Sequence, residues 1–420
     1  MSWKETCAMT ERMHFVSDLI KDERSMTELC RMYGISRPTG YKWRDRFDSG
    51  GVAALADRSH APLHQPYAVD EAVAQRLLQM RRQHPTWGPR KLLAWLQAHD
   101  RPTAWPAAST IGEILRRHGL VRARRRRASA AAEHWQVELV QPVAPNDLWC
   151  TDFKGQFRTQ DRYYCYPLTL SDAVSRYLLA CRGLPSTCGV LARPWFERAF
   201  RQYGLPLTIR SDNGTPFAST GLGGLSRLSV WWIKLGIVPE LISPGCPQQN
   251  GRHERMHRTL KCETAHPPAA NLRAQQRVFD HFVTEFNLQR PHEALQQRPP
   301  SAVYRASTRC YPSRLAPIEY PHGYQVRKIR HCGDMKFAGH AVFVSEVLRG
   351  EPVGLYQIDE YLWRLYFSMV PLGILDTRTM RIRRIKRHGS IRPQGARGAA
   401  PPAPPAGRRK SVNHQTGPKC

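Results

Sequence analysis

Three acidic residues in the middle of the chain combine a residue type and a setting that favour catalysis. Asp152 lies in an apolar, strand-like stretch, where aspartate is uncommon. Asp212 closely follows the apolar stretch "LTIR", and Glu254 begins a helix-like stretch after Asn250. Acids at strand ends and at a helix start can converge although they are far apart in sequence. Converging carboxylates repel one another unless divalent cations neutralise them. The pattern therefore predicts a site that binds two Mg²⁺ (or Mn²⁺) ions through oxygen ligands.

The string "HERMH" at residues 253–257 offers a competing interpretation, the zinc site of a metalloprotease. His253 and His257 would share one helical face, and Glu254 would be the general base. This interpretation leaves Asp152 and Asp212 without a role, and the sequence offers no obvious third zinc ligand. We therefore favour the site of three carboxylates.

Single acids of this kind also have structural interpretations, because aspartate before Asn-Gly is common in turns. Asp212 taken alone fits such a turn, since "NG" follows it. For Asp172, in "LTLSDAVSR", we prefer the structural interpretation. It is predicted to lie in a hairpin turn and to pair with Arg176.

The composition predicts a polyanionic partner. The chain has 420 residues, a length that favours about two to four domains. Its 63 Lys and Arg residues outnumber its 34 Asp and Glu residues, for a formal net charge of +29. The positive charge is clustered, at Arg122 and Arg124–Arg127 and again after Asp376. An excess of this size and clustering indicates nucleic acid rather than a basic protein without such a partner.

Cysteine usage and hydropathy indicate an intracellular protein. The eleven cysteines are scattered and include no C-x-x-C pair, which is typical of reduced thiols in a cytosol. The first residues are charged and no apolar core follows them, unlike a signal peptide. No apolar run approaches the length of a membrane span. We expect a cytoplasmic protein without a membrane partner.

Residues 1–65 are predicted to form a helix-turn-helix DNA-binding domain. In "SMTELCRMYGISRPTGYKWRDRF" (25–47), Gly34 separates two helices and Ser36 is the N-cap of the second. An ordinary helical hairpin with a basic face is the alternative. The residues on and around the second helix that are expected to bind DNA are Arg37, Thr39, Lys42, Arg44 and Arg46.

Residues 66–121 are predicted to form a second helix-turn-helix-like domain. Its third helix, in "PAASTIGEILRRHGLV", is expected to be capped at Ser109 or Thr110 and to stop at Gly119. Residues 122–143 are interpreted as a basic linker that lies along DNA phosphates. The linker residues expected to bind DNA are Arg124, Arg125 and Arg126.

Residues 144–306 are predicted to form a mixed α/β core. Strand-like runs are followed by alternating helices and strands; the runs are 147–157, 163–170, 177–183, 205–214 and 236–242, with helices at 188–204 and 247–265. Short strands at close spacing in 318–387 predict a small β-barrel, SH3-like in type. The tail, 388–420, is rich in Pro, Ala, Gly and Arg and is expected to be disordered.

Four segments together resemble the catalytic core of bacterial insertion-sequence transposases of the retroviral-integrase type. They are "WCTDFKG", "IRSDNGTPF", "LGIVPELISPGCPQQNGRHERMHRTLK" and "FVTEFNLQRPHEALQQRPPSAVY". The resemblance extends from about residue 10 to residue 380. Two features depart from it: "STGLGGLSRL" lengthens the spacing between the second and third acids, and helix-turn-helix units replace the His/Cys zinc module of retroviral integrases.

The resemblance implies an RNase H-like core in which Asp152, Asp212 and Glu254 form the Asp-Asp-Glu metal triad. It implies metal-dependent cleavage of DNA 3′ ends and strand transfer, with terminal repeats and target DNA as substrates. A homodimer or larger synaptic oligomer in the bacterial cytosol or nucleoid is also implied. On the helix of Glu254, the cations expected to touch DNA are Arg255, Arg258 and Lys261, with His257 as a further candidate.

Two alternatives to an active transposase remain open. A non-catalytic DNA-binding regulator derived from a transposase would keep the helix-turn-helix units over a decayed core. The presence of all three acids and of Lys261 argues against that alternative. A nuclease would cut DNA without joining it, and only product analysis separates it from a transposase.

Overall fold

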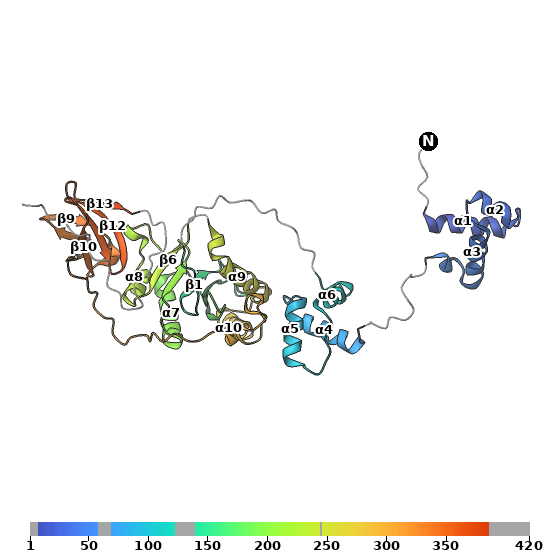
Figure 1. The fold of residues 1–420 in the computed structure, drawn as a ribbon, viewed down its shortest axis with the longest axis horizontal. Coiled ribbons are helices and arrows are strands. Elements are labelled where there is room, and N and C mark those ends of the chain that lie inside the picture. The colour runs from blue at the N-terminus through green and yellow to red at the C-terminus, as the bar shows by residue number, and fades with distance from the viewer. Residues whose placement is uncertain (1–6, 58–68, 122–138, 244–245, 386–420) are drawn as a thin grey trace, which may run out of the picture. The chain divides into compact units, whose positions relative to one another are not determined.

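The computed structural model describes residues 7–57, 69–121, 139–243 and 246–385. The chain divides into two compact units, Met1–Asp70 and Glu71–Cys420 (Figure 1). Two segments given roles above lie outside the described residues: the arginine cluster with Arg124, Arg125 and Arg126, and the tail 388–420. Within the described residues, no helix combines the length and the apolar character that a membrane span requires.

The first unit is a three-helix arrangement. Its helices are α1 (Ala8–Ile20), α2 (Met26–Met32), α3 (Arg37–Gly50) and the 3₁₀ turn η1 (Val52–Leu55). Gly34, with φ of 66°, makes the turn between α2 and α3, a backbone conformation that glycine adopts at low cost. Ser36 caps α3 by accepting a hydrogen bond from the Thr39 N–H. The buried Phe15, Leu29 and Trp43 form the centre of the core.

The second unit begins with three helices. They are α4 (Glu71–Gln83), α5 (Pro89–His99) and α6 (Ala108–Arg117). The prediction that Ser109 or Thr110 caps the third helix is wrong, because α6 begins at Ala108 and Ala107 occupies the N-cap without a side-chain hydrogen bond. The buried Ile111 and Leu115 are spaced four residues apart, so packing of one apolar face decides where this helix forms.

A six-stranded sheet forms the centre of the core. Its strands are β1 (Leu148–Phe153), β2 (Phe157–Arg158), β3 (Tyr164–Asp172), β4 (Leu178–Leu184), β5 (Thr208–Ser211) and β6 (Val238–Leu241). The strands β1, β3 and β4 pair antiparallel, whereas β1, β5 and β6 pair parallel. The predicted run 147–157 is two strands, β1 and β2, because the chain turns at Gly155 (φ of 67°) between them.

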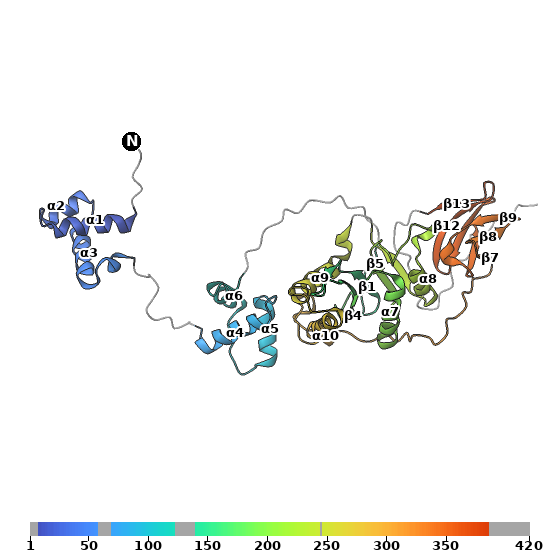
Figure 2. The ribbon, with the colours of Figure 1, turned by 180° about the vertical axis from the view of Figure 1, so that it is seen from behind.

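Helices cover both faces of this sheet (Figures 1 and 2). They are α7 (Gly189–Tyr203), α8 (Arg227–Lys234), α9 (Gly251–Thr264) and α10 (Leu272–Leu288). Phe196 and Phe200 of α7 and Trp232 of α8 pack with strand residues in one cluster. Met256 of α9 and Phe279 of α10 pack with residues of β3 and β4 in another. The shorter 3₁₀ turns are η2 (Leu222–Gly224), η3 (Pro247–Asn250), η4 (Glu293–Leu295), η5 (Pro300–Ala302) and η6 (Glu346–Leu348).

The C-terminal described residues form two antiparallel sheets around one core. One sheet has the order β13-β12-β11-β10-β7, and the other pairs β8 with β9. The strands are β7 (Gln325–Lys328), β8 (Asp334–Phe337), β9 (His340–Phe343), β10 (Pro352–Gln357), β11 (Leu362–Phe367), β12 (Val370–Asp376) and β13 (Arg381–Arg384). Leu225, within the inserted "STGLGGLSRL" (219–228), and Val230 and Ile233 of α8 belong to the same apolar core. The inserted segment therefore helps to attach this β region to the α/β core.

Candidate active site

The first of the three acids lies in the middle of the sheet. Asp152 is near the end of β1 and pairs in register with Thr169 of β3. Its side chain is 25% exposed, which leaves the carboxylate partly shielded from water. Burial is the largest cause that raises the pKa of Asp152, to about 7.

The second acid follows the neighbouring parallel strand. Asp212 comes directly after β5, whose residues pair with β1, so both acids lie at the same end of adjacent strands. The Gly214 N–H donates a hydrogen bond of 3.2 Å to its Oδ1. Burial nevertheless raises the pKa of Asp212 above its ordinary value.

The third acid comes from the helix that covers this part of the sheet. Glu254 is in the first turn of α9 and is exposed. After burial, the negative charge of Asp212 is the next cause that raises the pKa of Asp152, and Glu254 contributes further. The neighbouring cation Lys154 acts in the opposite direction. The structure thus brings the three acids close enough for each of the other two to influence Asp152.

The donor chemistry of these acids fits a divalent cation, although the described residues hold no ready three-ligand group. Among those residues, no set of three His, Cys, Asp or Glu side chains is arranged to hold one metal ion. The raised pKa of Asp152 shows that its negative charge is poorly compensated by the protein. A hard cation bound by carboxylate oxygens would supply the missing positive charge.

The two histidines of "HERMH" face inward and attach α9 to the sheet. His253 and His257 are 2% and 1% exposed, and the Nε2 atom of each is hydrogen-bonded to the Thr169 hydroxyl, at 2.7 and 2.6 Å. His253 Nδ1 is hydrogen-bonded to the Ser171 hydroxyl at 2.8 Å. Burial lowers the pKa of both imidazoles, to about 3 for His253. The expectation that His257 touches DNA is therefore wrong, because the ring is buried and neutral.

A buried ion pair fixes the segment that leads into α9. Arg210 of β5 and Glu240 of β6 are joined by an Nε–Oε2 distance of 2.6 Å, and both side chains are buried. Arg210 also donates to the carbonyls of Val140 and Gln249, at 2.8 and 3.2 Å. Because Gln249 lies in η3, two residues before α9 begins, this network connects the start of the helix that carries Glu254 to the strand that precedes Asp212.

Asp172 serves the turn after β3, as predicted, but its partner differs from the prediction. Its carboxylate accepts hydrogen bonds from the backbone N–H groups of Asn146, Val174 and Ser175 and from the Ser175 hydroxyl. Arg176 instead donates to the Ala173 carbonyl at 2.6 Å. Backbone N–H groups and the Ser175 hydroxyl, rather than the Arg176 guanidinium, therefore satisfy the hydrogen-bonding capacity of Asp172.

The residues of α3 that were predicted to bind DNA are on or near its surface. Arg37, Lys42 and Arg44 are exposed, while Thr39 and Arg46 are partly buried. Arg44 is 2.9 Å from Asp45, and the Thr39 hydroxyl is hydrogen-bonded to Ser36 at the helix start. Within this set, the exposed Arg37 and Lys42 therefore have the fewest competing contacts with acids.

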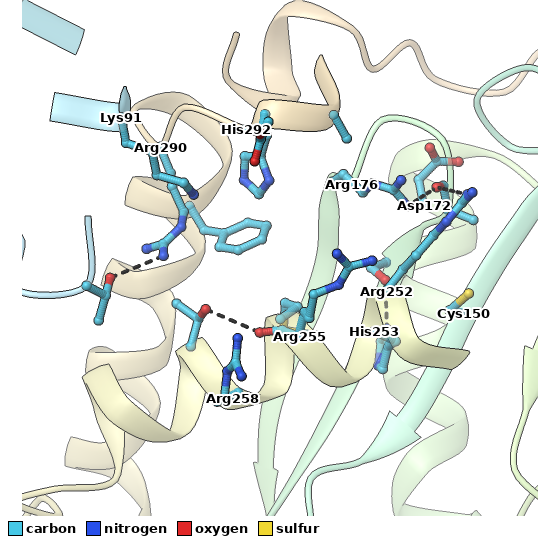
Figure 3. A pocket seen from close by; sticks show the side chains of 18 of the residues that line it. Lys91, Cys150, Asp172, Arg176, Arg252, His253, Arg255, Arg258, Arg290 and His292 are labelled. Carbon is cyan, nitrogen blue, oxygen red and sulfur yellow. Dashed lines mark hydrogen bonds between the residues drawn. The ribbon is translucent and has the colours of Figure 1, made fainter. Parts of the chain in front are cut away.

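The predicted cations of α9 are all exposed, and two of them line a cavity (Figure 3). Arg255 and Arg258, three residues apart, face this cavity, whereas Lys261 is not among its lining residues. Arg258 was expected beside the metals, four residues after Glu254. The structure places it, with Arg255, in the lining of this cavity.

Comparisons with known sequences agree with this architecture. Two families described as integrase core domain match residues 142–247 and 235–300. The matched span contains β1, β5 and α9, the elements that carry the three acids. A helix-turn-helix domain matches residues 11–62, and a homeodomain-like domain matches residues 39–115. The chain therefore contains an integrase core domain and, N-terminal to it, helix-turn-helix domains.

Relatives of this chain include bacterial and viral proteins. It is 29% identical over 262 residues to the "Insertion element IS407 uncharacterized 31.7 kDa protein" of Burkholderia multivorans, an alignment that covers 60% of this chain and 90% of that protein. It is 34% identical over 117 residues to the Gag-Pol polyprotein of baboon endogenous virus, covering 28% of this chain and only 6% of the polyprotein.

Solved structures with some similarity to this chain include viral ones. The HTLV-2 integrase catalytic core domain in complex with magnesium matches with a TM-score of 0.32 and 16% identity, over 39% of this chain and all of that chain. A chain of the simian T-cell lymphotropic virus intasome in complex with PP2A regulatory subunit B56 gamma matches with a TM-score of 0.34 and 13% identity. That match covers 69% of this chain and 91% of the other chain.

Several positioning residues were missed in the sequence. Thr169 and the Arg210–Glu240 pair hold the elements that carry the acids. Charged residues inside the short apolar strands "TIRS" and "VPEL" were a usable signal for the pair, because isolated charges are rarely buried without a partner. Nothing in the sequence marks Thr169, since threonine is ordinary in strands.

Proposed function

We propose that the integrase core cleaves DNA at the 3′ ends of a mobile element and joins those ends to target DNA. Asp152, Asp212 and Glu254 are the residues to which we assign the chemistry. The observation that carries this assignment is the raised pKa of Asp152, caused by burial and by the other two acids. An acid whose pKa is strongly raised by burial and by neighbouring acids is more typical of a functional site than of a structural one.

We assign the three carboxylates the role of holding two Mg²⁺ (or Mn²⁺) ions. Such ions act as Lewis acids at a scissile phosphate and favour the displacement of one oxygen by another. In this proposal two of the ligands come from neighbouring parallel strands, Asp152 from β1 and Asp212 from the end of β5, and Glu254 comes from the first turn of α9. The buried contacts of His253 and His257 with Thr169 keep α9 against the sheet.

The remaining parts of the chain are assigned to DNA. Residues 1–65 and 66–121 are proposed to bind the terminal repeats, with Arg37 and Lys42 of α3 reaching base edges or phosphates. The core is proposed to span residues 144–306, and the β region 318–387 is proposed to be an SH3-like barrel. Joining two ends in one reaction calls for a homodimer or larger synaptic oligomer, which would act on DNA in the bacterial cytosol or nucleoid.

A strand-transfer assay with DNA that flanks the coding region tests this proposal. We expect the full chain to release cleaved 3′ ends and to form joined products with Mg²⁺, and to form neither with EDTA. Cleavage without joined products would identify a nuclease instead. End binding without either product, in Mg²⁺ and in Mn²⁺, would favour the non-catalytic DNA-binding regulator and contradict the proposal.

A further inference from the structure

A cavity lies beside α9, and none of the three acids Asp152, Asp212 and Glu254 lines it. It has a volume of about 520 Å³, within the roughly 300–1,000 Å³ that is typical of small-ligand sites. Residues of α9, of the turn between β3 and β4, and of the segment after α10 line it (Figure 3). The site therefore has room for a group larger than a single phosphate.

The walls of this cavity carry positive charge that acids do not neutralise. Within the described residues, no ion pair joins a carboxylate to Arg176, Arg252, Arg255 or Arg258. Burial, and then Arg252 and Arg255, lower the pKa of Arg176 to about 10. A buried arginine whose pKa is lowered by neighbouring arginines, and which no ion pair joins to a carboxylate, is typical of an anion site.

The two acids in the cavity wall are already occupied. The Asp172 carboxylate accepts four hydrogen bonds, three from its own turn and one from the N–H of Asn146. Glu293 is 2.8 Å from Arg90. A further cation, Lys91, has a pKa lowered to about 8, first by burial and then by Arg290. The cavity thus keeps a net excess of positive charge.

The floor of the cavity is apolar and aromatic. Met256 and Phe286 line it, and the Phe286 ring packs against His292 with ring centroids 4.9 Å apart. Burial, then Lys91 and Arg290, lower the pKa of His292 to about 3, so its imidazole is neutral. Its Nε2 atom is shielded from solvent and has no hydrogen-bond partner among the described residues.

We propose that this cavity binds one unpaired nucleotide, with the arginines on its phosphate and the base against Phe286 and His292. Phosphate alone would leave the aromatic floor and the unpartnered His292 nitrogen without a role. Unpaired bases stack on Phe, His and Arg side chains and hydrogen-bond through their edges, whereas bases in a duplex are already stacked. A neutral imidazole can serve such an edge as donor or acceptor.

The nucleotide can belong to a DNA strand, or it can be a free mononucleotide from the cell. The proposed function favours a DNA strand, because Arg255 follows Glu254 directly in α9 and a strand that crosses the acids would reach the cavity next. In this respect the inference rests on the proposed function. The chemistry of recognition is the same for a free mononucleotide, so the experiment must separate the two sources.

The test measures how tightly the full chain binds a DNA probe in the presence of EDTA. The probe is a DNA duplex with a short unpaired 5′ extension that contains 2-aminopurine, compared with a blunt duplex. Competitors are thymidine monophosphate, inorganic pyrophosphate and polyglutamate. The variants are Arg252→Gln/Arg255→Gln, which removes phosphate contacts, and Ala294→Trp, which fills the cavity without changing its charge. Arg277→Gln, an exposed arginine of α10 outside the cavity, is the matched control.

We expect the unpaired extension to tighten binding and its 2-aminopurine fluorescence to be quenched by stacking. The double variant should weaken binding of the extension about tenfold or more, because it removes charged hydrogen-bond donors that would contact the phosphate. Ala294→Trp should abolish the quenching, and Arg277→Gln should change neither. Thymidine monophosphate should compete better than pyrophosphate. A free mononucleotide that matches the extended duplex in affinity would identify the free pool as the source and still support a nucleotide site.

Three results would overturn the proposal. They are equal effects of the double variant on blunt and extended duplexes, equal competition by pyrophosphate and mononucleotide, or stronger competition by polyglutamate, which would identify an acidic peptide site. The Asp152→Asn variant should bind the probe as the unmodified chain does. A failure of the cavity proposal therefore leaves the strand-transfer result intact, and a failure of strand transfer leaves this binding result intact.

Discussion

The two flanks of α9 carry opposite charges that the protein does not neutralise. On one flank, Glu254 and Asp212 add to the effect of burial and raise the pKa of Asp152. On another, Arg252 and Arg255 face a cavity, and no ion pair joins them to a carboxylate within the described residues. Glu254 and Arg255 are adjacent in sequence, yet Glu254 belongs to a group of acids and Arg255 to a group of arginines.

This difference indicates two kinds of ligand on one helix. Carboxylates that repel one another favour cations, and guanidinium groups that repel one another favour anions. The buried face between the flanks is neutral and fixed, because His253 and His257 are hydrogen-bonded to Thr169. One rigid helix can therefore position a metal site and a phosphate site at a constant distance from each other.

The largest expected effect is on chemistry, at the acidic flank. Asp152→Asn, Asp212→Asn and Glu254→Gln should each lower the rate of cleavage and joining by about a thousandfold or more, because losing a group that stabilises charge in the transition state costs roughly this much. Single-turnover assays with saturating DNA measure the rate. Binding to DNA ends in EDTA should change little.

The control for this prediction is Asp280→Asn, which removes an exposed acid of α10. It should leave the rate unchanged. If any one of the three acids tolerates its substitution as well as Asp280 does, that acid does not belong to the site.

The next effect concerns the buried face that separates the flanks. Thr169→Val removes the hydroxyl to which both imidazoles are hydrogen-bonded. Each buried group left without a partner costs about 1–3 kcal/mol, so the free energy of unfolding should fall by about 2–4 kcal/mol. Cleavage should also slow at a temperature where the variant is folded, because α9 would no longer be held against the sheet.

Thr284→Val on the exposed face of α10 is the matched control, since it removes a threonine hydroxyl without a buried partner. Thermal unfolding and single-turnover rates measure both variants. A Thr169→Val protein with the stability and rate of the control would show that the histidine contacts do not position α9.

A smaller effect is expected at the basic flank. Arg255→Gln should weaken DNA binding by roughly tenfold and reduce the slope of log affinity against log salt by about 1. The rate at saturating DNA should stay close to that of the unmodified chain, in contrast to the acidic flank. Titrations at several salt concentrations measure the affinity, with Arg277→Gln as control; an unchanged slope would exclude phosphate contact by Arg255.

The smallest effect is a dependence of stability on pH. The folded Asp152 carboxyl holds its proton up to about pH 7, against an ordinary value of 3.8. The folded state therefore loses stability as pH rises between these values. Asn cannot ionise, so in EDTA the Asp152→Asn variant should melt at nearly the same temperature as the unmodified chain near about pH 4. Above about pH 7 it should be more stable by about 1–3 kcal/mol, or roughly 2–8 °C.

Thermal unfolding at a series of pH values checks this prediction. Mg²⁺ should reduce the difference, because it would stabilise only the ionised carboxylate. A constant difference at all pH values would mean that the substitution acts through packing instead of through the charge of Asp152.

The order of elements could be predicted from the sequence, but several of their ends could not. Alternation of apolar residues and turn signals located the strands that carry Asp152 and Asp212. Helix α6 was misplaced at its start, because polar Ser109 and Thr110 suggested a cap whereas burial of Ile111 and Leu115 decided the boundary. Local propensity is overridden by tertiary packing at such positions.

The acids of the candidate site were visible in the sequence, but the contacts that position them were not. Asp152 stood out because aspartate is uncommon in strands. The partner of His253 and His257 lies on β3, far along the chain, so that no local pattern could reveal it. The cavity was missed for the same reason, since Arg176 and the arginines of α9 meet only in the folded chain.

Metal titration is the most direct test of the central claim that three acids share divalent cations. Calorimetry with Mn²⁺ should detect binding of two ions by the full chain bound to a DNA end. Each of Asp152→Asn, Asp212→Asn and Glu254→Gln should remove or greatly weaken that binding, and Asp280→Asn should not. Unchanged Mn²⁺ binding in any one of the three variants would contradict the claim.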